Sequence, residues 1–267
     1  MTTMSFGRAL FALGLLGLGV QNLILADLVP ELQPFATNSA ARAPLAALLG
    51  SALFAAGVAL LANFRVRFVA ALLAALFALW LFGFFVPALI ARPLSVGTWV
   101  GAGEILSFAG TSAVLAAAAP HESHLTARWN ACLQRHAAPG RIGFALALPL
   151  FGAVHFLYTD FLAGMIPAWI AGAVAWVQVT GAARIAAGLA LFVPALARAA
   201  ATLIGLMYGA WLLLLHLPRL AAQPENRAEW TLACIALALC GGAWLIAVTS
   251  TPLAGTSRTE SLAELRR

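Results

Sequence analysis

Eight long apolar runs, separated by short polar breaks, dominate this 267-residue chain. Each run is close to the length that an α-helix needs to cross the hydrocarbon core of a bilayer, about 20 residues. Hydrophobic residues make up 63% of the chain and charged residues 9%, whereas soluble domains carry about 45–50% and about 25%. A soluble core of this length could not bury so much apolar surface. The pattern therefore predicts an all-α polytopic membrane protein embedded in the lipid bilayer, with spans at 9–26, 44–62, 68–90, 97–118, 142–159, 172–193, 199–217 and 230–249.

The basic residues are all arginines, and they are divided unevenly between the two sides of the membrane. If the N-terminus lies inside, ten arginines face the inner side and four the outer side, which with Arg184 inside a span accounts for all fifteen. The positive-inside rule then places both termini and the central linker in the cytoplasm, and a bacterial inner membrane is the expected location. Because the arginines form no basic stripe, the net charge of +6 does not indicate a nucleic-acid partner.

The two halves of the chain match each other when one is slid along the other. Matches of residues with positional meaning predict a tandem duplication, with a first four-span repeat at 1–119, a cytoplasmic linker at 120–140, a second repeat at 141–250 and a cytoplasmic tail at 251–267. Because four spans return the chain to its starting side, the repeats are parallel, and we expect two four-helix bundles. The matching pairs are Gly19/Gly152, Asp27/Asp160 and Pro34/Pro167 at an offset of 133, and Gly57/Gly188, Arg67/Arg198, Trp80/Trp211, Pro87/Pro218, Pro93/Pro224, Trp99/Trp230 and Gly110/Gly241 at an offset of 131.

One arginine falls near the middle of a predicted span. A charge at the bilayer centre costs about 2.5–3.5 kcal/mol on insertion scales, so Arg184 needs an acceptor inside the protein. Glu104 and Asp160 are the two carboxylates expected within reach. Two interpretations remain open: a structural ion pair that locks the helices together, or a buried site for an anion or a polar head group.

Polar side chains concentrate at the outer side of the second half. We interpret this cluster as a ligand-binding pocket that could hydrogen-bond a quinone-like carbonyl and exchange protons with the outer phase. An ordinary interfacial belt of polar residues is the alternative. The first half has Asn22, Leu53 and Phe85 where the second has His155, Arg184 and His216, so the chemistry is expected in the second half alone. The cluster comprises His155, Tyr158, Asp160, His216, Arg219 and Glu229, with Arg184 deeper in the membrane.

Haem and a bound metal ion are two alternatives to a quinone. His155 and His216 could ligate one haem from two spans, but their expected position near the aqueous edge disfavours haem. The linker histidines His121 and His124 have only an HxxH spacing in an arginine-rich loop, which is poor evidence for a metal site. A quinone is therefore the one cofactor that the pattern favours.

Four segments of the second half carry a resemblance to a known family. They are HFLYTDFLAGMIPAWI (155–170), TGAARIAAGLALFVPALAR (180–198), GLMYGAWLLLLHLPR (205–219) and the stretch from Glu229 to Trp244. This half resembles the DoxX-like membrane proteins, and the first half resembles them weakly through the internal match. The resemblance implies an integral four-helix unit, sometimes linked to quinone-coupled sulfur oxidation as in thiosulfate:quinone oxidoreductase subunits. Arg184 departs from the Glu or apolar residue common in that family, so no catalytic role is carried over.

The chain has no Walker loop, GxSxG, HExxH or Rossmann fingerprint, and no catalytic residue is assigned. We expect an accessory or redox-associated membrane subunit that binds a quinone- or lipid-like molecule near the outer side of the second bundle. It would work with a membrane redox partner or as a homo-oligomer. A small-solute transporter and a structural or assembly protein are the alternatives.

Overall fold

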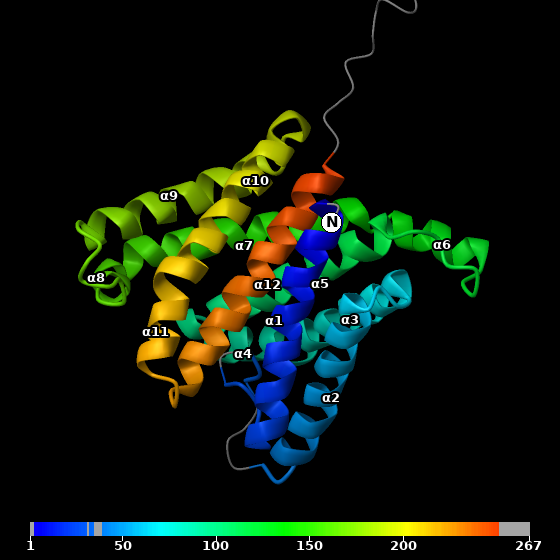
Figure 1. Cartoon of the computed structure of the whole chain (residues 1–267), viewed down its shortest axis with the longest axis horizontal. Helices are drawn as coiled ribbons and strands as arrows, with labels where there is room; N and C mark the ends of the chain where they lie inside the picture. Colours follow the sequence, from blue (N-terminus) through cyan, green and yellow to red (C-terminus); the bar gives the residue numbers. More distant parts are fainter. Residues whose placement is uncertain (1–2, 31, 35–38, 251–267) are drawn as a thin grey trace, which may run out of the picture.

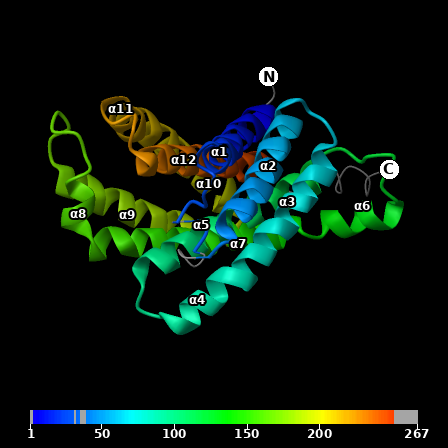
Figure 2. The same ribbon diagram turned by 90° about the horizontal axis from the view of Figure 1, so that it is seen from below.

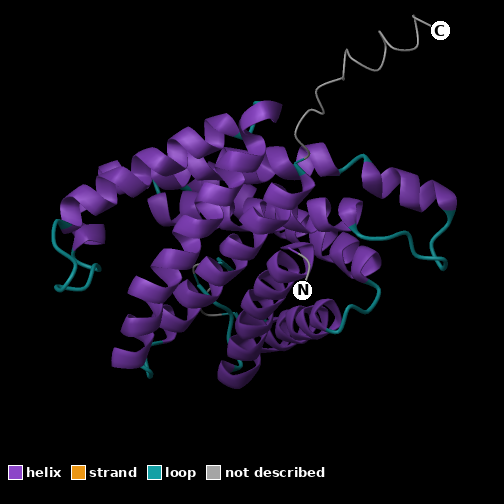
Figure 3. Cartoon of the chain, turned by 45° about the horizontal axis from the view of Figure 1, so that its top comes forward, coloured by secondary structure: helices purple, strands orange, loops and turns teal. Residues whose placement is uncertain are grey.

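The computed structural model describes residues 3–30, 32–34 and 39–250. This part of the chain consists of helices joined by loops and contains no strand, as Figure 3 shows. The tail predicted at 251–267 lies outside the described residues. The elements are α1 (Thr3–Leu25), α2 (Arg42–Leu61), α3 (Val66–Trp80), η1 (Leu81–Phe85), α4 (Val86–Ala91), α5 (Val96–Ala118), α6 (Ala127–Gln134), α7 (Ala137–Leu157), α8 (Thr159–Ala163), α9 (Ala173–Ala190), α10 (Pro194–Trp211), η2 (Leu212–His216), α11 (Leu217–Ala222) and α12 (Arg227–Thr249).

Eight helices in the described ranges are long and apolar enough to cross a membrane, which confirms the predicted all-α polytopic fold. Three of them are compound, because α3, η1 and α4 form one stretch, α10, η2 and α11 form another, and α6 is continuous with α7 in the third. The predicted boundary at residue 140 falls inside α7, which begins at Ala137. The linker also contains a helix of its own, α6, whose first turn is capped by the hydroxyl of Thr126.

The π-helical turns η1 and η2 occupy matching positions in the two halves. Each precedes a proline, Pro87 or Pro218, which has no N–H and would clash with the carbonyl four residues earlier. The backbone avoids this conflict by widening, so that Val86 and Leu217 donate to the carbonyls of Leu81 and Leu212, five residues back. Each span thus continues past its proline.

The bounds of several helices correspond at the offset found in the sequence. Adding 131 to the bounds of η1, α4 and α5 gives those of η2, α11 and α12, and α9 begins 131 residues after α2. The indole N–H groups of Trp99 and Trp230 donate to the carbonyls of Pro93 and Pro224, each at 2.8 Å. Residues at matching positions therefore set the ends of these helices in both halves.

The packing is not that of two self-contained bundles side by side. The first helix of each half packs along the last helix of the other, α1 on α12 and α7 on α5. Figures 1 and 2 show α5 and α12 in the middle of the molecule, with α2 and α3 on one flank and α9 on the other. Within an 18-residue apolar stretch of each span, 78% of the residues of α5 and of α12 are buried inside the protein. The corresponding share is 28–44% in the other six spans.

Glycines permit these exchanged contacts. A Cβ atom at Gly140 of α7 would lie 2.6 Å from the carbonyl oxygen of Gly110 in α5, and one at Gly241 of α12 would lie 2.6 Å from that of Gly7 in α1. Real Cβ atoms do not come this close, so the helices approach through their bare backbones. At the centre, Gly242 of α12 lies against Thr111 of α5, its counterpart at an offset of 131.

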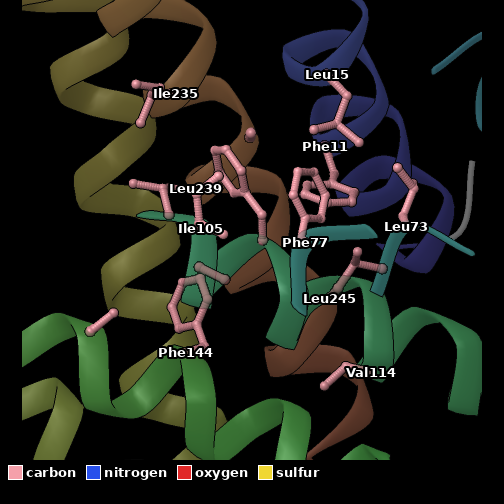
Figure 4. Packing of buried hydrophobic residues seen from close by; sticks show 14 of the residues in the cluster. Phe11, Leu15, Leu73, Phe77, Ile105, Val114, Phe144, Ile235, Leu239 and Leu245 are labelled. Atoms are coloured by element: carbon pink, nitrogen blue, oxygen red, sulfur yellow. The ribbon is translucent and has the colours of Figure 1, made fainter. Parts of the chain in front are cut away.

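Interlocking aromatic and aliphatic side chains fill the space between the central helices (Figure 4). Phe108 of α5 meets Phe11 of α1 and Phe77 of α3, with ring centroids 6.2 and 5.6 Å apart. At the end of the molecule that carries the N-terminus, Arg67 is 1% exposed. Its guanidinium donates to the carbonyls of Ala117, Ala119, Pro120 and Asn130, which satisfies the last turn of α5 and holds the linker.

Candidate functional site

A cavity of about 1170 Å³ lies between α5 of the first half and the helices of the second half. It opens at the end away from the N-terminus, because its rim includes residues of the α1–α2, α4–α5 and α8–α9 connections. Its wall is mostly apolar, with a small set of polar groups, which is the usual make-up of small-molecule sites. The polar and aromatic lining includes Thr98, Glu104, His155, Tyr158, Thr180, Arg184, Tyr208, Trp211 and His216.

Arg184 projects from the middle of α9 and stacks on two aromatic rings. Its guanidinium carbon lies 4.9 Å from the ring centroid of Tyr208 and 5.9 Å from that of Phe151. Cation–π contacts of this kind offset part of the cost of keeping a cation away from water. Its Nε atom is buried and has no hydrogen-bond partner.

The predicted ion pair of Arg184 is not among those formed between described residues. None of the ion pairs between described residues joins Arg184 to Glu104 or Asp160. Asp160 is exposed on the short helix α8 and does not line the cavity. Glu104 does line the cavity, from α5, and is 8% exposed. The structure therefore holds the guanidinium by aromatic stacking.

Tyr208 is the site residue that the sequence reasoning missed. It lies on α10, is 3% exposed, and its hydroxyl has no hydrogen-bond partner in the described structure. One turn further, Trp211 lines the cavity and meets Trp176 edge-on at 6.1 Å. Comparing Tyr208 with Phe77, 131 residues earlier, would have revealed it.

The two predicted histidines line the same cavity from different spans. In His155 on α7, Nδ1 lies 2.7 Å from the carbonyl oxygen of Phe151; donating there would leave Nε2 as an acceptor in the neutral ring. His216 ends the π turn η2, and its Nδ1 is buried without a partner. Tyr158 lies at the rim and is exposed.

Arg219 and Glu229 pair with each other outside the cavity lining. Arg219 Nη2 lies 2.5 Å from Glu229 Oε1, and its Nε 3.0 Å from Oε2, so the pair is bidentate. Glu229 is 3% exposed, and Arg219 also donates to the carbonyl of Met165. This arrangement ties α11 to α12 and to the loop after α8. It satisfies the carboxylate within the protein, which suits a structural role.

A second ionic group joins the two halves at the cavity rim. Asp27 lies 2.7 Å from Arg42, a rim residue, and 3.3 Å from Arg227 at the start of α12. Burial acts to raise the pKa of the Asp27 carboxyl, but hydrogen bonds from Arg42 and the Leu28 N–H, with the Arg42 charge and Arg227, bring it below its ordinary value.

The matching region of the first half is nearly filled. Its cavity measures about 10 Å³ and is lined mostly by apolar side chains, with Gln33 as the exception. Among them are Leu53, Phe77 and Ile105, whose counterparts in the second half are Arg184, Tyr208 and Ala236. Such a space is at the lower limit for one water molecule. The first half does contain unpaired polar atoms, on Asn22 and Trp80, and Trp80 borders the small cavity.

Comparison with known proteins gives one match. A family model described as a domain of unknown function (DUF8561) matches residues 144–247, which is nearly all of the second half. No curated protein and no solved structure matches the chain. The matched segment contains every described residue of the second half that lines the cavity, from Phe151 to Leu239.

Proposed function

We propose that this membrane protein binds a quinone- or lipid-like amphiphile in the cavity of its second half, as an accessory or redox-associated subunit. The observation that carries the proposal is the contrast between two matching regions of one chain. One holds a cavity of about 1170 Å³ with several polar groups in an apolar wall, and the other has a cavity of about 10 Å³ lined mostly by Leu and aromatic side chains. A scaffold role alone would not require the second half to stay open.

We further infer that the two halves descend from one four-helix unit and that the chain is a DoxX-like protein of the bacterial inner membrane. The matching helix bounds and π turns support the duplication. With both termini in the cytoplasm, as the arginine distribution indicates, the cavity opens on the outer side. A membrane redox partner or a second copy of the chain would then complete a working complex.

The lining residues fit a quinone head group in their donor chemistry. The Tyr208 hydroxyl and a histidine N–H can donate to ring carbonyls, and the aromatic walls suit a flat ring. A quinone would supply two-electron redox chemistry when bound. The chain's own residues would orient it and exclude water around its polar atoms.

A cavity-blocking variant tests the proposal. Gly97 lines the cavity, and a Cβ atom added there meets no other atom within 4 Å, so Gly97→Trp introduces bulk without a backbone clash. Gly83 has the same free space but does not line the cavity, so Gly83→Trp is the matched control. Native mass spectrometry of the full chain released from its membrane should show a bound amphiphile in the wild type and in Gly83→Trp. Equal retention by Gly97→Trp would contradict the proposal.

A further inference from the structure

We propose that the ligand's head group is acidic, a carboxylate or phosphate ester, and that it binds the guanidinium of Arg184 with the hydroxyl of Tyr208 beside it. This inference rests on the proposed function and names the class of amphiphile that the cavity takes. It favours an anionic lipid-like molecule over a neutral quinone.

The charge of Arg184 is the first argument. A guanidinium stays protonated in proteins, so this span carries a permanent cation. Two aromatic faces stabilise it, yet aromatic faces accept none of its N–H groups. No hydrogen bond from Arg184 to any described residue is formed, and its Nε is buried. Planar oxyanions match the donor fork of arginine in two parallel bonds, whereas a quinone carbonyl offers one neutral oxygen.

The neighbours of Arg184 provide the second argument. Tyr208 lies in the same wall and is 3% exposed. Its hydroxyl has no hydrogen-bond partner among the described residues. Arg92 and Arg42 line the rim, and Arg42 is already paired with Asp27. Among the described lining residues there are thus three arginines and one carboxylate, that of Glu104 on helix α5. The resulting potential favours entry of an anion.

The apolar wall indicates that this anion carries a hydrophobic tail. Phe151, Val154, Leu162, Leu215 and Leu239 line the cavity between its polar groups. Its volume of about 1170 Å³ exceeds what an inorganic anion could fill, and lies above the ~300–1,000 Å³ typical of ligand pockets. A chain of methylene groups gains about 0.8 kcal/mol per CH₂ buried from water.

The test compares ligands that share a tail and differ in the head. Dodecanoate, dodecanol, decyl-ubiquinone and inorganic phosphate are titrated into the full chain in mild detergent at neutral pH. Binding that Gly97→Trp abolishes is counted as cavity binding. We expect dodecanoate to bind at least about tenfold more tightly than dodecanol, since hydrogen bonds between charged groups are worth about 1.5–3 kcal/mol. Phosphate alone should bind far more weakly than dodecanoate.

Variants taken from the first half identify the residues responsible. Arg184→Leu, which copies Leu53, should remove the preference for the acid, so that dodecanoate binds no more tightly than dodecanol. Tyr208→Phe, which copies Phe77, should weaken dodecanoate binding by about two- to tenfold, as expected for one neutral hydrogen bond. Arg198→Leu is the charge-matched control, because Arg198 is exposed and does not line the cavity. Tyr208→Phe keeps the test valid if Arg184→Leu fails to fold.

The outcomes separate the two proposals. Equal binding of acid and alcohol, or tighter binding of decyl-ubiquinone that Arg184→Leu leaves unchanged, would overturn the acidic head group and leave the proposed function standing. Phosphate binding as tightly as dodecanoate would overturn the requirement for a tail. If no amphiphile shows binding that Gly97→Trp abolishes, the proposed function fails and this inference fails with it.

Discussion

At the residue scale, a few substitutions between matching positions separate an open site from a packed core. Arg184, Tyr208 and His216 stand where the first half has Leu53, Phe77 and Phe85. Each of the three polar side chains keeps at least one buried atom without a hydrogen-bond partner. Unpaired buried polar groups cost about 1–3 kcal/mol each. Such groups are retained at binding sites, where a ligand supplies the missing hydrogen-bond partner, because function is often kept at the expense of stability.

Exchanging Tyr208 and Phe77 tests this explanation. Tyr208→Phe removes an unpaired hydroxyl, so we expect the ligand-free protein to keep its stability or gain up to about 1 kcal/mol. The reciprocal Phe77→Tyr places a hydroxyl beside a cavity of about 10 Å³ and should lower stability, by about 1–3 kcal/mol. Thermal unfolding in detergent without added ligand measures both. Strong destabilisation by Tyr208→Phe would mean that the hydroxyl has a structural role.

How far the site could be read from the sequence differs from residue to residue. A charge in an apolar run stands out, so Arg184 and the two histidines were found, and the structure brings them to one cavity. Arg219 and Glu229 were assigned to the same pocket, but they satisfy each other because helix turns bring α11 and α12 together at those two residues. Spacing along one chain does not reveal which of several polar neighbours pair. Tyr208 could not be assigned to the site from the sequence, because a tyrosine in an apolar run is typical of a packed core.

At the element scale, hydrophobicity predicts the number and approximate positions of the spans, but not which helices pack against each other. Hydrophobicity identifies α5 and α12 as spans but does not mark them as central, because lipid and protein interior favour the same side chains. The small residues carried that information. Gly110, Gly140, Gly241 and Gly7 mark the two crossings where the halves exchange helices.

Enlarging one of these glycines should separate the central helices. A Cβ atom at Gly241 would lie 2.6 Å from the Gly7 carbonyl oxygen and 2.9 Å from the Phe11 Cα, so Gly241→Val cannot be accommodated without moving α1. We expect a loss of about 1–3 kcal/mol or more, the usual cost of overpacking. Gly83→Val, at a position with free space, is the control and should be much milder. Unfolding followed by circular dichroism compares the two, and equal effects would show that α1 and α12 are not closely packed.

At the scale of the whole molecule, Asp27 links the halves across the cavity rim. Its folded pKa lies below its ordinary value, and the unfolded carboxyl titrates near 3.9. The stabilisation is therefore fully present above about pH 4–5 and is lost as the pH falls through the folded pKa. Because the Asp27 side chain is 38% exposed, we discount the effect to about 0.2–1 kcal/mol. The stability difference between the wild type and Asp27→Asn should vanish in acid, and a difference unchanged down to pH 2 would contradict the role of the charge.

The orientation of the molecule decides which compartment supplies the ligand, and the chain's own cysteines can report it. Cys132 is exposed in α6, whereas Cys240 is buried and Cys234 partly so. If the linker is cytoplasmic, a membrane-impermeant maleimide should label Cys132 in inverted vesicles and leave it unlabelled in intact cells. Cys132→Ala removes this signal and provides the control.

In the Cys132→Ala background, Gly97→Cys places a thiol at the cavity, on the opposite end of α5 from the linker. The same reagent should label it from outside the cell, since the cavity opens at the end away from the N-terminus. Bound dodecanoate should slow that labelling, because an occupied cavity shields Gly97→Cys. Labelling of Cys132 from outside would reverse the topology and make the cytoplasm the source of the ligand. In that case the cavity itself would stand, but a role facing the outer phase would be wrong.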